Sequence, residues 1–145
     1  SGTTCISADR SFVDTNVFVC LFDDSEPRKQ SVAAKRLQAE QRERELVVST
    51  QVLQELYVAL TRGKSPIASL DIAERAVREA SELTVTQVDT QLVLEAMETC
   101  RKNRISFWDA LIVRSAGSSG CAVLLSEDMN DGQVIEGVRV ENPFR

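Results

Sequence analysis

The sequence contains no histidine. This absence excludes Ser-His-Asp triads, Cys-His pairs, HExxH sites and every zinc or iron centre with imidazole ligands. Cysteine is scarce, with four residues at positions 5, 20, 100 and 121 and no Cys-x-x-Cys spacing. All-thiolate zinc sites need such paired spacing, so we expect reduced thiols in a cytoplasmic protein. Acid–base or metal chemistry must therefore depend mainly on carboxylates.

Long apolar runs are also lacking. The longest stretch without Asp, Glu, Lys or Arg is residues 115–126, only 12 residues. A membrane span needs about 18 apolar residues, and the N-terminus has no basic flank followed by an apolar run. We therefore expect neither a membrane span nor a signal peptide. A chain of 145 residues with 43% hydrophobic content is typical of one globular domain with its own core.

The sequence has no excess of positive charge. It carries 17 basic and 22 acidic residues, a net charge of −5, which is not the usual footprint of a nucleic-acid-binding protein. Acidic active sites neutralised by bound metal ions produce the same balance, so a nucleic-acid substrate is not excluded. Thirteen of the basic residues are arginine, which suits phosphate recognition but more often reflects genome base content.

Apolar segments of strand type alternate with segments of helical periodicity. This alternation predicts an α/β fold in which helices cover both faces of a parallel sheet. Residues 1–10 are polar and unpatterned, which predicts an N-terminal arm, and the start Ser1-Gly2 without Met is typical of an expression remnant. Residues 11–145 form the single domain. Strands are predicted at 11–14, 46–48, 83–88, 122–126 and 138–140, and helices at 17–22, 27–44, 50–62, 70–80, 90–103 and 107–116.

Two of the predicted strands are followed by an acidic residue. Asp14 ends the first strand, and Asp128 lies just beyond the strand at 122–126. Because the carboxyl ends of parallel strands share one edge of a sheet, these side chains are expected to meet there. An acid after a strand is equally typical of a helix cap or a turn.

Two further acids lie near the starts of predicted helices. Glu55 flanks the apolar face of the third helix, although a glutamate there is also favourable with the helix dipole. Asp109 completes a capping-box pattern with Ser106. Its neighbours are nearly all apolar, so we expect Asp109 to be partly buried or at a cleft edge. Trp108 lies in the same apolar segment; it could stack on a base, but the segment favours a core position.

Four carboxylates converging without histidine would form a site for a hard cation. Mg²⁺ and Mn²⁺ prefer oxygen ligands and retain waters for substrate phosphates. Without a cation, the carboxylates would repel one another. The matching chemistry is metal-assisted hydrolysis of a phosphodiester.

Four motifs then resemble, in order, the acidic motifs of PIN-domain nucleases. They are FVDTN at 12–16, QE at 54–55, FWDALI at 107–112 and LLSED at 124–128. The resemblance is closest to the VapC toxins of bacterial toxin–antitoxin pairs and extends from Phe12 to about Phe144, nearly the whole chain. The sequence segments SFWDALIV and LLSEDMNDGQ contribute most to this resemblance.

The resemblance implies a small parallel sheet between two helical layers and an Mg²⁺- or Mn²⁺-dependent endoribonuclease. It implies RNA as substrate, an antitoxin partner whose tail blocks the active site, and a homodimer. In-line attack of an activated water would leave 5′-phosphate and 3′-hydroxyl ends. Transferred by motif, the metal-binding and catalytic acids would be Asp14, Glu55, Asp109 and Asp128, with Asn16 and Ser126 as polar residues that orient them. Asp131 is either an auxiliary ligand or a turn residue before Gly132.

Other readings of the same residues remain. A phosphoacceptor receiver domain would have an acidic pair after the first strand and a late lysine, but Asp14 stands alone and no lysine follows Lys102. A phosphatase with an aspartate nucleophile would have a second Asp at position 16. A catalytically silent PIN-fold domain that binds RNA or protein is the main alternative, and the four acids count against it. Seven basic residues are candidate phosphate contacts, although each is more typical of a solvated surface charge: Arg36, Arg62, Lys64, Arg101, Lys102, Arg104 and Arg114.

Overall fold

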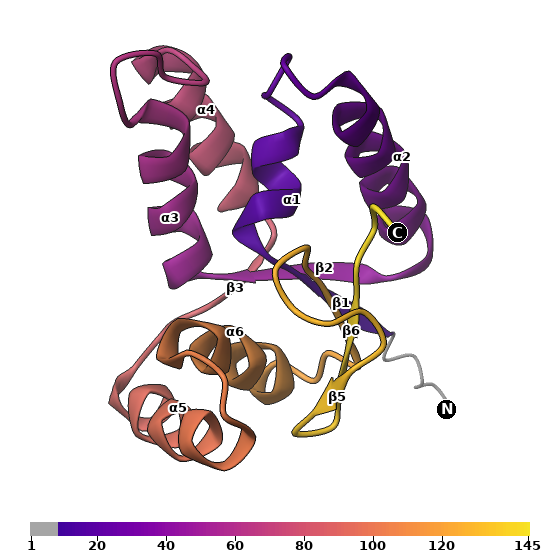
Figure 1. The fold of residues 1–145 in the computed structure, drawn as a ribbon, viewed down its shortest axis with the longest axis vertical. Coiled ribbons are helices and arrows are strands. Elements are labelled where there is room, and N and C mark those ends of the chain that lie inside the picture. The colour runs from indigo at the N-terminus through magenta and orange to yellow at the C-terminus, as the bar shows by residue number, and fades with distance from the viewer. Residues whose placement is uncertain (1–8) are drawn as a thin grey trace.

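The computed structural model describes residues 9–145, so residues 1–8 of the predicted N-terminal arm lie outside the described residues. Strands and helices alternate along the chain as predicted (Figure 1). The elements are β1 (Arg10–Val13), α1 (Thr15–Cys20), α2 (Pro27–Glu43), β2 (Glu45–Ser49), α3 (Thr50–Thr61), α4 (Leu70–Ala80), β3 (Thr84–Thr86), α5 (Thr90–Asn103), α6 (Phe107–Ser118), β4 (Val123–Leu125), β5 (Val134–Ile135) and β6 (Val138–Glu141).

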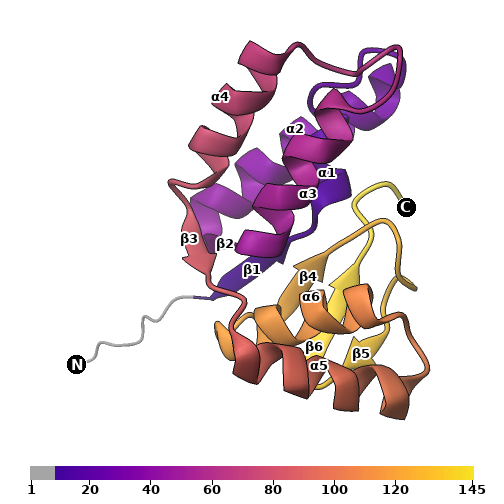
Figure 2. The ribbon, with the colours of Figure 1, turned by 90° about the vertical axis from the view of Figure 1, so that its left-hand side faces the viewer.

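One six-stranded sheet organises the molecule, in the order β3-β2-β1-β4-β6-β5. All neighbouring strands are parallel except β5 and β6, which are antiparallel. Helices α1–α4 lie on one side of the sheet, whereas α6 packs on the opposite face with α5 outside it (Figures 1 and 2). The three-layer α/β/α fold predicted from the sequence is confirmed.

The central strands β1 and β4 form the core. Phe12, Val13, Leu124 and Leu125 are all fully buried, as expected for parallel strands covered by helices on both faces. Val13 pairs with Leu125, so the two strands end side by side. The residues that follow these strands therefore meet at one edge of the sheet.

The hairpin of β5 and β6 was only half predicted, because β5 was not recognised. Glu136 and Gly137 connect the strands with φ angles of 50° and 79°, the positive values that a tight two-residue hairpin turn requires. Glu-Gly is not among the usual residue pairs of such turns, so the sequence signal is weak. Strand β1 also begins at Arg10, one residue before the predicted domain start.

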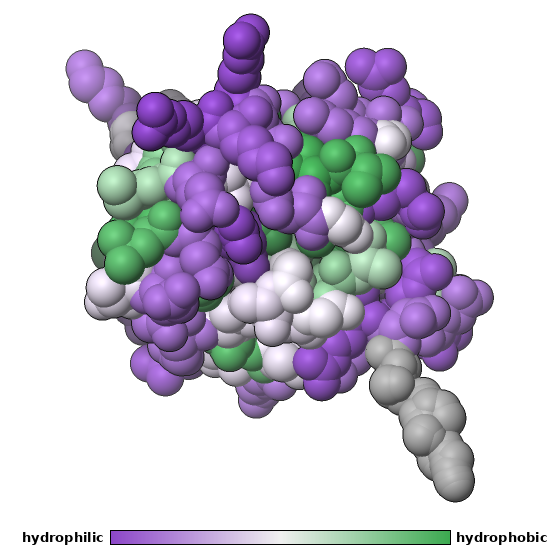
Figure 3. All heavy atoms as spheres, turned by 90° about the horizontal axis from the view of Figure 1, so that it is seen from below, coloured by the Kyte–Doolittle hydropathy of each residue, from purple (hydrophilic) through white to green (hydrophobic). Residues whose placement is uncertain are grey.

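The predicted core position of Trp108 is wrong. Its side chain is 61% exposed and packs edge-on against Phe107, with ring centroids 5.2 Å apart. Helix α6 turns Ala110, Leu111 and Val113 toward the interior instead. The side of the molecule that carries α5 and α6 is mostly hydrophilic, and its apolar area is divided into separate patches (Figure 3).

Two further observations bear on the sequence predictions. Across residues 9–145, no helix combines the length and the apolar composition that crossing a membrane requires. Cys20, Cys100 and Cys121 are free thiols, as predicted, whereas Cys5 lies outside the described residues.

Candidate active site

The adjacent ends of β1 and β4 bring Asp14 and the 126–128 segment together. The Asp14 backbone N–H donates to the Leu125 carbonyl at 2.9 Å, which continues the pairing of the strands by one residue. Asp14 is 5% exposed, and Ser126 is fully buried. The predicted convergence at the carboxyl edge of the sheet is therefore present for this pair.

Asp14 receives hydrogen bonds at both carboxylate oxygens. It is the N-cap of α1, and its Oδ1 accepts from the Thr15 backbone N–H at 2.7 Å. Its Oδ2 accepts from the Ser126 hydroxyl at 2.8 Å. The Ser126 oxygen in turn accepts from the Asp128 backbone N–H at 3.2 Å. Ser126 thus ties Asp14 to the segment that carries Asp128.

Glu55 is also held at both oxygens. The Thr15 hydroxyl donates to its Oε1 at 3.1 Å, and the Gln51 amide donates to its Oε2 at 3.2 Å. The same Gln51 nitrogen lies 3.4 Å from the Trp108 carbonyl oxygen, which it also bonds. Hydrogen bonds therefore link α1, α3 and the first turn of α6, next to Asp109.

Asp109 lies in the first turn of α6, where its backbone N–H donates to the Ser106 hydroxyl at 3.0 Å, as the capping-box pattern predicts. It is half-buried. Burial, and then the negative charges of Asp128 and Glu55, raise the pKa of Asp109. Its carboxylate therefore belongs to the same electrostatic group, although it does not line the cleft described below.

The group carries negative charge without a neutralising cation. Burial raises the pKa of Asp14 from 3.8 to about 6 despite its two hydrogen bonds, and the charges of Asp128 and Glu55 contribute in the same direction. Within residues 9–145, no lysine or arginine forms an ion pair with Asp14, Glu55, Asp109 or Asp128. A buried carboxylate without a counter-charge is costly, and binding of a cation would lower that cost.

A cleft of about 640 Å³ opens beside Asp14, Glu55 and Asp128. Two buried polar atoms at this site have no hydrogen-bond partner: the Asn16 side-chain nitrogen and the Gln51 side-chain oxygen. The nitrogen is a donor and the oxygen an acceptor, so the first could donate to a water or a phosphate oxygen and the second could accept only from a donor such as water. No three acidic or cysteine side chains in the described part of the chain are placed to enclose a metal together. Mg²⁺ commonly binds through one or two carboxylates and several waters, so this all-oxygen set fits it.

The two predicted orienting residues lie at the site, whereas Asp131 does not. The Asn16 side-chain oxygen accepts from the Glu127 backbone N–H at 3.2 Å and so fixes the chain before Asp128. Asp131 is exposed and accepts from the Asn142 backbone N–H at 2.8 Å. This contact holds the loop to the C-terminal segment and leaves Asp131 outside the cleft lining.

Sequence reasoning missed Thr15 and Gln51. Thr15 joins Asp14 to Glu55, with its backbone N–H on the first and its hydroxyl on the second. It lies between two residues that were singled out, so its position was a usable signal. Gln51 precedes Glu55 by four residues, the spacing that places two side chains side by side on a helix.

Comparison with known proteins identifies a family model that matches most of the chain. The family model for the PIN domain matches residues 11–130. No curated protein sequence matches the chain.

Solved structures share the fold over nearly the whole chain. VapBC2 from Rickettsia felis bound to promoter DNA is 16% identical, with a TM-score of 0.68, covering 92% of this chain and 98% of that one. A toxin–antitoxin complex from Klebsiella pneumoniae is 17% identical, with a TM-score of 0.69 and coverages of 92% and 97%. VapC20 from Mycobacterium tuberculosis, a toxin that cleaves the sarcin–ricin loop, is 24% identical, with a TM-score of 0.64 and coverages of 89% and 98%.

Proposed function

The chain belongs to the PIN-domain family, and we propose from this premise that it is an Mg²⁺- or Mn²⁺-dependent endoribonuclease of the VapC type. The observation that carries the proposal is Asp14, a buried carboxylate with a raised pKa in a group of acids that no basic side chain of residues 9–145 neutralises. Such a group is costly in a folded protein unless a cation binds it.

Asp14, Glu55, Asp109 and Asp128 would hold the cation, directly or through water. Once bound, a divalent ion activates the attacking water and stabilises the negative charge that develops on the phosphate. The Ser126 hydroxyl and the Thr15 N–H fix the orientation of the Asp14 carboxylate. Thr15 and Gln51 do the same for Glu55. The free Asn16 amide nitrogen supplies a donor for a phosphate oxygen or a water.

The structural neighbours also support a proposal about the role of this protein in the cell. Several of them are toxin–antitoxin complexes, and one is a toxin that cleaves the sarcin–ricin loop. We therefore propose that this chain is the toxin of such a pair in the cytoplasm. Its partners would be an antitoxin that blocks the cleft and a second copy of the chain. A catalytically silent domain of the same fold would have no need to retain all four acids.

The test is cleavage of a mixed pool of structured and single-stranded RNAs by the purified protein. The reactions contain Mg²⁺, Mn²⁺ or a chelator, and an Asp14→Ala protein purified in parallel controls for contaminating ribonuclease. We expect cleavage that requires the metal, leaves 5′-phosphate ends and is lost in the variant. Equal behaviour of the two proteins on every RNA, together with no calorimetric signal for either metal, would leave only the catalytically silent domain.

A further inference from the structure

One wall of the cleft is a single face of α3 and the residue that follows it. Glu55, Val58, Ala59 and Arg62 all line the cleft. Their spacing of three, four and seven residues places them on one side of a helix. Arg62 follows Glu55 by seven residues, a rise of about 10 Å along the helix axis. The wall therefore has a carboxylate at one end, apolar side chains between and a guanidinium at the other.

Arg62 is the basic cleft residue that forms no ion pair with an acidic side chain of the described chain. Six acidic side chains and two basic ones, Lys29 and Arg62, line the cleft. Lys29 forms an ion pair with Glu127. The exposed Arg62 side chain makes neither an ion pair nor a hydrogen bond with any residue of the described chain. An arginine near a helix end also interacts favourably with the helix dipole, but that effect requires no cleft.

Val58 provides the apolar part of the wall. It is 54% exposed although it faces the cleft, and it lies one helical turn from both Glu55 and Arg62. A strand of RNA presents the same order of chemistry, with a phosphate, then a sugar and base, then the next phosphate. Because the rest of the cleft is acidic, a polyanion needs a cation along its path in addition to any cation at Asp14.

We propose that Arg62 binds an RNA phosphate next to the bond that is cut, and that Val58 packs against the nucleoside between the two phosphates. This inference rests on the proposed function, because it takes the acids as the position of the cut phosphodiester. The strand then follows α3 from Glu55 toward Arg62. Arg62 acts in substrate binding and does not take part in the chemical step.

The kinetic test compares Arg62→Gln with Lys64→Gln. Lys64 is an exposed cation two residues further along that does not line the cleft, so it controls for the loss of one positive charge. We expect Arg62→Gln to raise KM about five- to tenfold at low salt while kcat changes less than about twofold. Lys64→Gln should change neither constant, and Arg62→Lys should recover most of the loss. Equal KM values for the Arg62→Gln and Lys64→Gln proteins would overturn the inference.

A binding measurement keeps the inference separate from catalysis. A labelled single-stranded oligoribonucleotide of mixed sequence is titrated with the Asp109→Asn protein, with and without Arg62→Gln, over a range of salt concentrations. Loss of one phosphate contact should reduce the slope of log affinity against log salt by about 0.7. An unchanged slope, or no binding at all, overturns the role of Arg62. Binding that depends on Arg62 without cleavage by the wild-type protein would contradict the proposed nuclease instead.

Discussion

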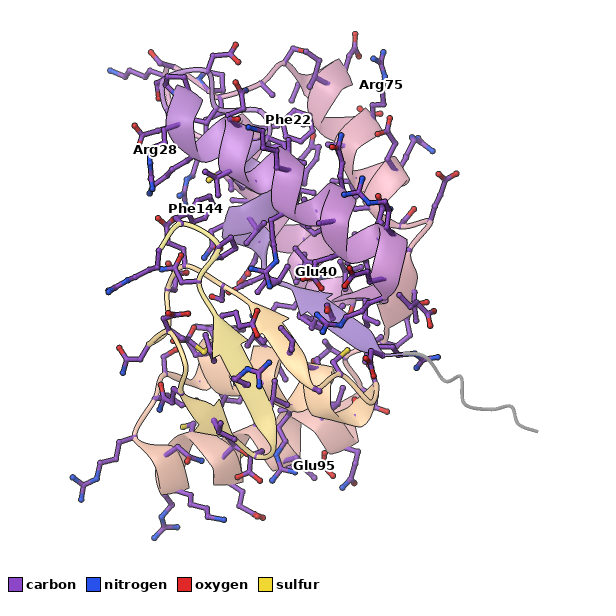
Figure 4. The ribbon with its side chains drawn as sticks, turned by 90° about the vertical axis from the view of Figure 1, so that its right-hand side faces the viewer. Phe22, Arg28, Glu40, Arg75, Glu95 and Phe144 are labelled. Carbon is purple, nitrogen blue, oxygen red and sulfur yellow. The ribbon has the colours of Figure 1, made fainter. Side chains whose placement is uncertain are left out.

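Two carboxylates with almost the same exposed fraction lie near opposite ends of β1, and their pKa values are shifted in opposite directions. Asp14 is 5% exposed and Glu40, on α2, is 6% exposed. Each accepts a hydrogen bond from a serine hydroxyl: Asp14 from Ser126 at 2.8 Å and Glu40 from Ser11 at 2.7 Å. Figure 4 shows Glu40 on the side of α2 that faces the sheet. The two sites differ in the positive charge around them.

Glu40 has its counter-charges within the chain. Arg36 donates to its Oε2 at 2.8 Å, and Arg44 donates to its Oε1 at 3.1 Å. Burial on its own raises the pKa of Glu40, but the hydrogen bonds from Ser11, Arg36 and Arg44 outweigh it and leave the pKa lowered. Asp14 has two hydrogen bonds and no arginine, and its pKa is raised to about 6.

In the proposed function, this difference separates a structural carboxylate, Glu40, from one that binds a cation, Asp14. Burial raises the pKa at both sites, because it removes a charge from water. At Glu40 the chain itself offsets that effect. At Asp14 no basic side chain of residues 9–145 offsets it, and in the proposed function a bound cation does so. Buried acids are thus distinguished by what neutralises them, and the predictions below test that distinction by the same carboxylate-to-amide change at both positions.

The largest expected effect is on catalysis. Asp14→Asn should reduce RNA cleavage about a thousandfold, because stabilisation of the transition state by a bound metal is worth several kcal/mol. Glu40→Gln should leave kcat of the folded protein within about twofold. Single-turnover cleavage, normalised to the folded fraction from circular dichroism, measures both. Comparable losses of cleavage rate in the two variants would contradict the distinction between Asp14 and Glu40.

The second-largest expected effect is on stability, and we expect it for Glu40→Gln. Glu40→Gln removes the buried carboxylate that Arg36 and Arg44 share, while Arg36 keeps its ion pair with Glu141. Because both arginines are partly exposed, we expect a cost of about 1.5–3 kcal/mol, the range for hydrogen bonds to charged groups. Urea unfolding at neutral pH should show a lower midpoint with an unchanged slope. A midpoint equal to that of the wild type would mean that the arginines find other partners and that Glu40 is not needed for stability.

Asp14→Asn should have the opposite effect on stability in the presence of a chelator. The folded protein holds the Asp14 proton up to about pH 6, whereas a free aspartate releases it near pH 3.8. The ionised group therefore destabilises the folded state above pH 6 by about 3 kcal/mol, and this penalty disappears as the pH falls toward 4.

The amide should therefore stabilise the protein by about 1–3 kcal/mol at pH 7.5 and by almost nothing at pH 4. Urea unfolding of both proteins at a series of pH values measures the difference. Glu40 contributes in the reverse sense, because a lowered pKa stabilises at neutral pH and that contribution is lost on acidification. A gain for Asp14→Asn that does not vary with pH would point to packing rather than charge.

The smallest effect concerns the link between two of the acids. Thr15→Val preserves the shape of the side chain but removes the hydroxyl that donates to Glu55. Groups that orient metal ligands are typically worth tenfold or more, so we expect about a tenfold lower kcat/KM with an unchanged fold. Thr15→Ser retains the hydroxyl and should restore the activity. If both variants cleave like the wild type, Glu55 does not need this contact.

The fold could be predicted from local patterns because every helix and every strand except β5 has a recognisable signal in its own segment of the sequence. Asp14 directly follows β1 and Asp128 lies three residues beyond the end of β4, so the parallel topology alone is enough to bring their segments together. The roles of the four acids in metal binding and catalysis stay predictions. The short strand β5 was not predicted because the turn that follows it has an unusual sequence. Trp108 was misplaced because an apolar segment does not reveal which of its side chains a helix turns outward.

Contacts between distant elements could not be predicted. Ser11 lies 29 residues from Glu40, and Ser126 lies 112 residues from Asp14. Nothing in the local sequence distinguishes a buried glutamate with two arginines from an exposed one in a charged helix. The same limit hid the hydrogen bond from Gln51 to the Trp108 carbonyl, 57 residues away, although its four-residue spacing from Glu55 is local.

The most direct measurement is a calorimetric titration of Mn²⁺ into the wild-type, Asp14→Asn and Glu40→Gln proteins at pH 7.5. The account predicts saturable binding to the wild-type and Glu40→Gln proteins and loss of that binding in Asp14→Asn. Equal binding by all three proteins, or none by the wild type, would contradict the claim that the unneutralised acids at the end of β1 await a divalent cation.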